Sequence, residues 1–429
     1  MLGLSKDTII NISNIKKEPK WMLDFRLKSY ESFLNLDLPK FGPKIELDFD
    51  KILYYKDTSE VMTDNWCCVD CTVKETFDNL GVIKAEEEYL HGVTNQLDSE
   101  VIYSKKKDDD GVIFTSTDDA LKLYPDLFKK YFNDLVKYDE NKFTALNGAV
   151  WSGGSFIYIP PNTKLDRPLQ SYFRIDSKSL GQFERTIIIV DDDSELDYIE
   201  GCTAKNYAIN SLHAGVVEIY VGKNAKCRYI TIQNWSKDVY NLVTKRALVE
   251  ESGQMEWIDG NIGSGITMKY PACILKGDYS KGNSISIAYA KEDQILDAGA
   301  KMIHIGKHTK SNILSKSISE HGGISNYRGL VRITKDAEKS VARVNCETIM
   351  LDDISISNTY PTNITENENS YIEHEATISK VSAEKLFYLK SKGLSEESAK
   401  ELLILGFVEE FKKSLPLEYA VELNRLLKE

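Results

Sequence analysis

Short alternating runs of hydrophobic and polar residues fill the chain from about residue 147 to residue 379 and predict β-strands there. Each run is rich in β-branched and aromatic residues and is followed by a polar turn with Gly, Asn, Asp or Lys. The turns begin near six positions: Asp192, Gly222, Glu251, Asp278, Lys307 and Lys335. Their spacing of roughly 27–30 residues is typical of solenoid repeats. The pattern favours a right-handed β-helix, with an antiparallel β-sandwich as the alternative.

Helical patterns flank this region on both sides. Apolar side chains recur at helical spacing within residues 18–36, and the stretch 72–145 is predicted to be mostly helical. Amphipathic helical segments return after Ser379. We therefore predict a mainly β protein with a mostly helical region over 1–145, a β-helix core over 146–380 and a helical domain over 381–429. The last region either caps the end of the solenoid or binds a partner through its leucine and phenylalanine stripe.

Composition narrows the class of protein. The 429 residues include 54 Lys and Arg against 66 Asp and Glu, a formal net charge of −12, which argues against a general binder of nucleic acid or anionic membranes. No stretch approaches the ~20 apolar residues of a membrane span, and the amino terminus lacks the apolar segment of a signal peptide. We expect a cytoplasmic protein, or the mature form of a plastid protein. Without a GxxxxGK[ST] phosphate loop, it is not expected to hydrolyse ATP.

The seven cysteines differ in their surroundings. Cys227 and Cys273 lie in apolar runs and are predicted to be buried and inert. The run Cys67-Cys68-x-x-Cys71 holds three thiols within five residues, but no later C-x-x-C pair is present to complete a zinc site. A metal site and ordinary cysteines are both open there. Cys202 follows Glu200-Gly201, which predicts a turn with solvent access and possible thiolate chemistry; a structural thiol is the equal alternative.

The strongest candidate for metal chemistry lies near the carboxyl end. Cys346 is followed by Glu373-His374-Glu375, so thiol, imidazole and carboxylate ligands suited to iron, zinc or copper occur together. Because side chains alternate along a strand, the two glutamates should face one side and His374 the other. The ligand set on that strand is therefore His374 alone or the Glu373/Glu375 pair, unless two chains meet there.

Polar side chains in or near the strands of the repeat region form a second group of candidates. They are Arg174, Gln233, Trp235 and Lys245. If they point into the solenoid they must be paired, because a buried charge without a partner is costly. Solvent-facing positions are the alternative, and alternation alone does not decide.

Long strings of this sequence resemble the SufB/SufD family, which forms the scaffold of the SUF iron–sulfur cluster assembly system. The strings include EPKWMLDFRLKSYESF, KFTALNGAVWSGGSFIYIP, YIEGCTA, SNYRGLV and IEHEATISKVSAEKLFYLKSKGLSEESAKELLILGF. The resemblance runs from about residue 17 to the end. The cysteine in YIEGCTA, the cysteine before the last strands and the Glu-His-Glu run are features of the SufB branch.

The resemblance implies a role for each candidate. Cys202 would accept sulfur from a cysteine desulfurase and its sulfur carrier, and Arg174, Gln233, Trp235 and Lys245 would line the sulfur route through the β-helix. The nascent iron–sulfur cluster would be held by Cys346, Glu373, His374 and Glu375.

The resemblance also implies partners. The carboxyl-terminal helices would dock the SufC ATPase, the end of the β-helix would pair with SufD or a second SufB, and apo iron–sulfur proteins would receive the cluster. The cluster type and the binding of a reduced flavin stay open. The rival hypotheses are a β-helix enzyme acting on polysaccharide and an interaction module with structural cysteines.

Overall fold

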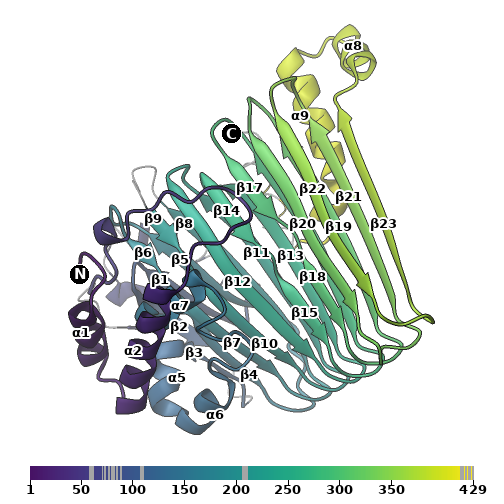
Figure 1. Cartoon of the computed structure of the whole chain (residues 1–429). Coiled ribbons are helices and arrows are strands. Elements are labelled where there is room, and N and C mark those ends of the chain that lie inside the picture. Colours follow the sequence, from purple (N-terminus) through teal and green to yellow (C-terminus); the bar gives the residue numbers. More distant parts are fainter. Residues whose placement is uncertain are drawn as a thin grey trace.

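The core of the chain is a β-solenoid of about eight turns, in which successive strands lie side by side (Figure 1). The structure is a computed structural model. It describes residues 1–429 apart from 58–61, 70, 72–73, 76–77, 79–82, 84–85, 87–88, 107–110, 205–210, 416–419, 421–422, 424–426 and 428–429. No helix within those described ranges is long and apolar enough to cross a membrane.

Two sheets form the walls of the solenoid. Counted over the described residues, sheet 1 has ten strands. In spatial order they are β2 (Glu100–Lys106), β1 (Gly92–Leu97), β5 (Leu169–Ile175), β8 (Glu195–Ala204), β11 (Lys226–Trp235), β13 (Gln254–Gly263), β16 (Lys281–Ala290), β19 (Lys310–Ser319), β21 (Val341–Met350) and β23 (Tyr371–Lys380).

Sheet 2 faces sheet 1 and has thirteen strands in the same part of the chain. Its main path is β14 (Ile266–Lys269), β17 (Ile295–Ala298), β20 (Ile324–Ile333), β18 (Lys301–His304), β15 (Ala272–Leu275), β12 (Val239–Val249), β10 (Val216–Val221), β7 (Arg185–Val190), β4 (Ser155–Ile159) and β3 (Ile113–Ser116). Three more strands pair alongside: β6 (Gly181–Gln182), β9 (Ser211–His213) and β22 (Ile356–Thr365).

The repeat predicted from the turns is confirmed by the strand register. Lys226 of β11 pairs with Glu195, 31 residues earlier, and Arg228 contacts Glu256, 28 residues later. Pairing between successive turns is parallel, which excludes the antiparallel sandwich. Each polar turn places one residue in the left-handed region, at Asp193, Asn224, Ser252, Tyr279, His308 and Lys339.

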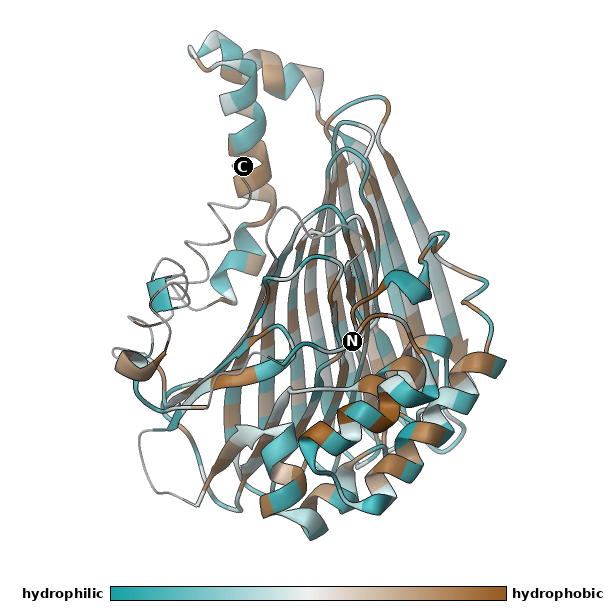
Figure 2. Cartoon of the chain, turned by 90° about the vertical axis from the view of Figure 1, so that its left-hand side faces the viewer, coloured by the Kyte–Doolittle hydropathy of each residue, from teal (hydrophilic) through white to brown (hydrophobic). Residues whose placement is uncertain are grey.

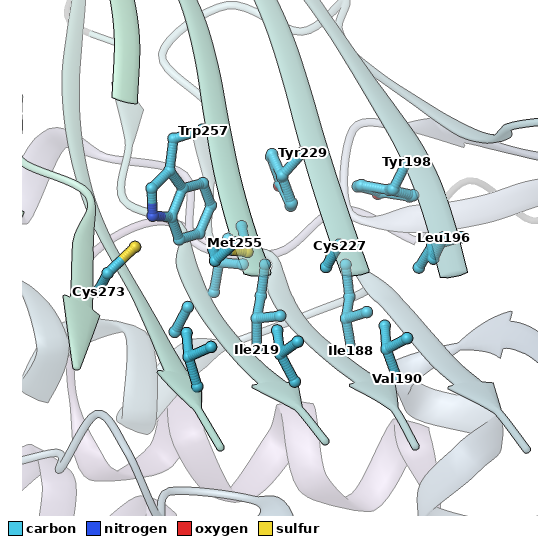
Figure 3. Packing of buried hydrophobic residues seen from close by; sticks show 14 of the residues in the cluster. Ile188, Val190, Leu196, Tyr198, Ile219, Cys227, Tyr229, Met255, Trp257 and Cys273 are labelled. Carbon is cyan, nitrogen blue, oxygen red and sulfur yellow. The ribbon is translucent and has the colours of Figure 1, made fainter. Parts of the chain in front are cut away.

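Alternation divides each sheet 1 strand between an inward and an outward face. Tyr198, Tyr229 and Trp257 occupy the same inward position on three successive strands, and their ring centroids are 5.0 and 5.2 Å apart. Figure 3 shows them above Ile188 and Ile219 of sheet 2. Each aromatic contact adds about 0.5–1.5 kcal/mol beyond the burial of the rings.

The amino-terminal part combines helices and strands. The described helices are α1 (Lys6–Lys16), α2 (Lys20–Asn35), α5 (Thr117–Leu123), α6 (Pro125–Tyr131) and α7 (Lys142–Val150), with short 3-10 turns η1 (Phe49–Lys51) and η2 (Trp66–Cys68). The helix predicted within 18–36 is confirmed as α2. α2 packs closely against α7. A Cβ atom added to Gly148 of α7 would lie only 2.6 Å from the Ser29 side chain of α2.

The prediction of a mostly helical stretch over 72–145 is wrong for residues 92–116, which form β1, β2 and β3. Parts of residues 72–91 and 107–110 lie outside the described residues. β1 is buried because it pairs in parallel with β5 of the solenoid, a contact between distant segments that overrides local preference. Asp98, at φ 54°, turns the chain from β1 into antiparallel β2.

The carboxyl-terminal helices do not cap the solenoid, so that prediction is wrong. They are α8 (Ala383–Ser391), α9 (Glu396–Phe407) and α10 (Glu409–Lys413). Ile404, Val408 and Phe411 pack on outward isoleucines of sheet 1, such as Ile230 and Ile258. α9 and α10 lie on the side of this apolar outer face rather than across the end of the solenoid, whereas α8 projects beyond the strands (Figures 1 and 2).

The two ends of the solenoid differ. At the amino-terminal end, β2 and β3 run antiparallel to their neighbours, Thr63 bridges Tyr103 on β2, and α5 contacts β3. At the other end, β22 and β23 each have a neighbour on one side only among the described strands. They also expose apolar side chains, including Ile356, Tyr360, Ile364, Tyr371 and Ile378. The last turn is an open edge.

A buried ion pair joins the amino-terminal region to the solenoid. Arg185 and Glu218 are fully buried and 2.7 Å apart, and the Glu218 carboxylate also accepts the backbone N–H groups of Asn133, Leu135 and Val136.

We expect Glu218→Gln to lower the free energy of unfolding by about 3–5 kcal/mol, because it leaves the buried Arg185 charge unpaired. Urea unfolding followed by circular dichroism measures the change. Lys276→Gln, which breaks the exposed pair with Glu250, is the control and should have no measurable effect. Equal stability of Glu218→Gln and the parent would contradict the assignment.

Candidate functional site

Cys346 and His374 meet inside the last turn of the solenoid. They lie on neighbouring strands β21 and β23, where Cys346 pairs in register with Ala376 and Val344 with His374. The inward faces of both strands bring Cys346 Sγ to 3.8 Å from His374 Nε2. Two ligands of one tetrahedral metal, at about 2.3 Å for sulfur and 2.1 Å for nitrogen, stand about 3.6 Å apart. The pair therefore has the spacing of two ligands to one metal ion.

The protonation of the pair follows from its surroundings. Cys346 is 3% exposed, and burial raises the pKa of its thiol to about 12. Burial lowers the pKa of His374, so its imidazole is neutral at pH 7 and able to bind a metal. A metal that binds here must displace the thiol proton.

Two further side chains border the pair. The Tyr327 ring meets the His374 ring edge-on, with centroids 6.5 Å apart, and its hydroxyl is buried beside Cys346. Asn363 Nδ2 lies 3.2 Å from His374 Nδ1. A partner on Nδ1 fixes the orientation of the ring whose Nε2 faces the thiol.

Glu373 and Glu375 lie on the opposite face of β23, as strand alternation predicted. Both are exposed, and Glu373 Oε2 accepts from Arg343 Nε at 3.1 Å. No group of three or more His, Cys, Asp or Glu side chains that could hold a metal ion occurs among the described residues. Within that part of the chain, Cys346 and His374 are two side chains of ligand type that face each other, and the two carboxylates face away from them.

Cys202 lies within strand β8, and its predicted position in an exposed turn is wrong. It is 1% exposed. Gly201 does not mark a turn but makes room for a ring, since a Cβ there would come within 2.6 Å of Tyr172 on β5. Burial, with the nearby Glu200 charge, raises the pKa of the Cys202 thiol well above its usual value.

Buried charges surround Cys202 in pairs. Glu200 Oε1 lies 3.8 Å from Cys202 Sγ and 3.5 Å from Lys245 Nζ on the facing sheet, and Tyr229 donates to the other oxygen of Glu200. One strand further, Asp259 Oδ1 lies 2.8 Å from Lys269 Nζ. All of these side chains are buried, so each charge is stabilised by its neighbour rather than by water.

Of the predicted route residues, Gln233, Trp235 and Lys245 point into the solenoid and Arg174 does not. Gln233 pairs in register with Cys202, and Trp235 packs in the same buried cluster. Arg174 follows Phe173, whose ring shares that cluster, and therefore lies on the outer face. Its Nε donates to Asp176 at 3.1 Å.

One inward row of sheet 1 connects the two thiol regions. Eight residues share this register position on successive strands: Thr94, Ser171, Glu200, Thr231, Asp259, Ser286, Ser315 and Cys346. Five strand spacings separate β8 from β21, which corresponds to about 24 Å. The row is polar throughout, whereas the neighbouring inward row of Tyr198, Tyr229 and Trp257 is aromatic.

Among the remaining cysteines, the predicted burial of Cys227 and Cys273 is confirmed, whereas the exposure of the other three was not predicted. Cys227 and Cys273 are buried, and Cys67, Cys68 and Cys71 are exposed. In the described residues the last three do not form a metal-binding group.

Sequence reasoning missed a polar network around Cys202 that includes Glu184, Glu200, His213, Asn241 and Asp259. Strand alternation could have identified Glu200 as a neighbour of Cys202, because it lies two residues earlier on the same strand and therefore faces the same side. His213 and Asn241 come from the facing sheet, and no local pattern in the sequence indicates them.

Comparison with known proteins agrees with this architecture. Residues 173–407 match the family model described as SUF system FeS cluster assembly, SufBD core domain, and residues 69–171 match the SufBD protein N-terminal region. The chain is 53% identical over 430 aligned residues to the iron–sulfur cluster assembly protein SufB of Bacillus subtilis, covering 99% of this chain and 92% of that protein. Identity and coverage are the same for an iron–sulfur cluster assembly SufBD family protein of Staphylococcus saprophyticus.

Burial predicts which thiols react in the folded protein. We expect brief alkylation by iodoacetamide at pH 7 to modify Cys67, Cys68 and Cys71, while the four buried thiols react far more slowly until the chain is unfolded. Peptide mass spectrometry before and after denaturation counts the modified cysteines. Rapid modification of Cys202 or Cys346 in the folded chain would contradict the burial described above.

Proposed function

Because this chain belongs to the SufBD family of the SUF iron–sulfur cluster assembly system, we propose that it is the scaffold on which iron and sulfide are combined. The observation that carries the proposal is the Cys346–His374 pair, 3.8 Å apart in the open last turn. A thiolate and a neutral imidazole suit iron.

The site is half of a complete one. Cys346 and His374 hold the inner side of the nascent cluster, and Glu373 and Glu375 offer carboxylates on the outer face of the same strand. Further ligands come from a partner that pairs with the open edge of β22 and β23. A mixed set of sulfur, nitrogen and oxygen ligands binds a cluster less tightly than four thiolates, which suits a site that passes its product to apo iron–sulfur proteins.

Sulfur enters at Cys202 and moves toward Cys346 along the polar inward row. A cysteine desulfurase with its sulfur carrier supplies the sulfur, which Cys202 accepts as a persulfide. Gln233, Trp235 and Lys245 border this entry. The row then continues through Ser286 and Ser315, whose hydroxyl oxygens are 3.3 Å apart. Arg174 lies outside the interior and is not part of this route.

Two surfaces suit the partners. The edge of β22 and β23 fits a homologous subunit, either SufD or a second copy of this chain. Phe387, Tyr388 and Leu402 are exposed on α8 and α9 at 74%, 60% and 50%, which suits the docking of the SufC ATPase. Since the sequence has no phosphate loop, ATP hydrolysis belongs to that partner. A reduced flavin as electron source and a cytoplasmic location remain predictions.

The cluster site is tested by anaerobic reconstitution with iron, cysteine and a cysteine desulfurase. We expect the parent to gain the visible absorption of an iron–sulfur cluster, and Cys346→Ala and His374→Ala to lose most of it. Cys227→Ala removes a buried thiol away from the row and serves as the matched control. If Cys346→Ala reconstituted like the parent, the ligand assignment would be wrong. A parent that binds no iron would instead favour an interaction module.

Sulfur entry is tested by peptide mass spectrometry after incubation with the desulfurase and cysteine. We expect the Cys202 peptide to gain the mass of one sulfur atom and Cys202→Ser to abolish cluster formation from cysteine, because a serine hydroxyl cannot carry the sulfur as a persulfide. An unmodified Cys202 beside a modified thiol elsewhere would overturn the route.

A further inference from the structure

Two N–H donors beside Cys202 are buried without an acceptor. They are Gln233 Nε2 and Trp235 Nε1, which lack a hydrogen-bond partner among the described residues although both side chains are at most 2% exposed. Both residues lie on the inward face of β11, next to Cys202 on β8. Leaving buried donors unpaired costs free energy, so their retention points to an acceptor that is present during function.

A hydrogen-bond chain fixes the direction of the Gln233 amide. His213 bridges Glu184 and Asn241 through its two ring nitrogens. Asn241 Nδ2 then donates to Gln233 Oε1 at 2.8 Å, and Lys269 Nζ donates to the same oxygen at 3.1 Å. Because Gln233 Oε1 accepts both of these hydrogen bonds, the other end of the amide, Nε2, is the one without a partner among the described residues.

The same histidine positions the second donor. The His213 and Trp235 rings are 4.7 Å apart between centroids and inclined by 38°. Although burial alone would lower it, the neighbouring Glu184 carboxylate raises the pKa of His213. A protonated His213 donates through both ring nitrogens and locks the orientation of the chain that ends at Gln233.

The charges around Cys202 already balance, which identifies the kind of acceptor. Glu200 is paired with Lys245, Asp259 with Lys269, and Glu184 with His213. Beyond those pairs, Glu184 Oε2 and Asp259 Oδ2 have no donor among the described residues. Two neutral N–H donors, Gln233 Nε2 and Trp235 Nε1, have no acceptor there. They suit a small anion whose charge Lys245 can share, since Lys245 and Cys202 contact the same Glu200 oxygen at 3.5 and 3.8 Å.

We propose that Gln233 and Trp235 form an anion site for the terminal sulfur of a Cys202 persulfide, with Lys245 as its counter-charge. This rests on the proposed function, in which Cys202 accepts sulfur. The Cys202 thiol attacks the terminal sulfur of a carrier persulfide, so a sulfur–sulfur bond forms at Cys202 and the carrier's sulfur–sulfur bond breaks. The proton of Cys202 goes to the departing carrier thiolate, and no electrons are gained or lost.

The resting and loaded states then differ in charge. The resting thiol of Cys202 is neutral, because burial and Glu200 raise its pKa, and it leaves both donors free. The loaded persulfide carries a negative charge and accepts both. The donors therefore favour the loaded state over the empty one.

The test uses the full chain and inorganic polysulfide under anaerobic conditions. Trp235→Phe removes one donor while nearly conserving shape. Gln233→Met also conserves the shape, but it removes the amide donor together with the oxygen that accepts from Asn241 and Lys269. Trp257→Phe is the matched control, because it also removes a buried indole N–H but lies on β13, in the aromatic row. Peptide mass spectrometry measures the ratio of persulfide to thiol at Cys202.

We expect Gln233→Met and Trp235→Phe each to lower that ratio about tenfold or more, as for a lost hydrogen bond to a charged group, and Trp257→Phe to leave it unchanged. Circular dichroism checks that each variant is folded. If Trp235→Phe does not fold, the ratio measured for Gln233→Met tests the proposal. Parent-like ratios in both variants, or a parent that polysulfide does not load, would overturn the anion site. A parent loaded by polysulfide but not by the desulfurase would overturn the proposed sulfur entry and leave the anion site standing.

Discussion

The register of parallel strands is the constraint on which the rest of this structure depends. Each turn pairs residue by residue with the next, so a side chain at one inward position is stacked on the side chains at the same position in the neighbouring turns. An aromatic row and a polar row can therefore run side by side through one interior. A change of register by one residue would exchange the inward and outward faces of a strand.

This constraint also explains how so many charges are buried. Lys245 and Lys269 reach across from sheet 2 to carboxylates held at fixed inward positions on sheet 1. The repeats differ by three or four residues in length, as in the 28 and 31 residues described above. The extra residues lie in the turns and not in the strands. The same positions of each strand therefore face inward in every turn, and each buried charge keeps its partner.

Much of the fold could be predicted from the sequence because its signal is local. Polar turns at regular intervals predicted the repeat, and strand alternation correctly placed His374 opposite Glu373 and Glu375. The failures involve contacts between distant segments. Gly201 was interpreted as a turn because the Tyr172 ring that requires a glycine belongs to another strand. The helices after Ser379 were interpreted as either a cap or a partner-binding region, because their apolar stripe does not say which surface it covers. The network of His213 and Asn241 depends on how two sheets face each other, which no single strand encodes.

The unequal ends of the solenoid limit how copies can add to one another. A head-to-tail stack would need the open edge of β22 and β23 to pair with the opposite end. That end is blocked by antiparallel strands, the Thr63 bridge and α5. Among the described strands, head-to-tail stacking is therefore disfavoured, and an open edge is best matched by the same edge of a second copy or by a similar edge. Such a contact is closed by a twofold axis, so assembly through it stops at two solenoids.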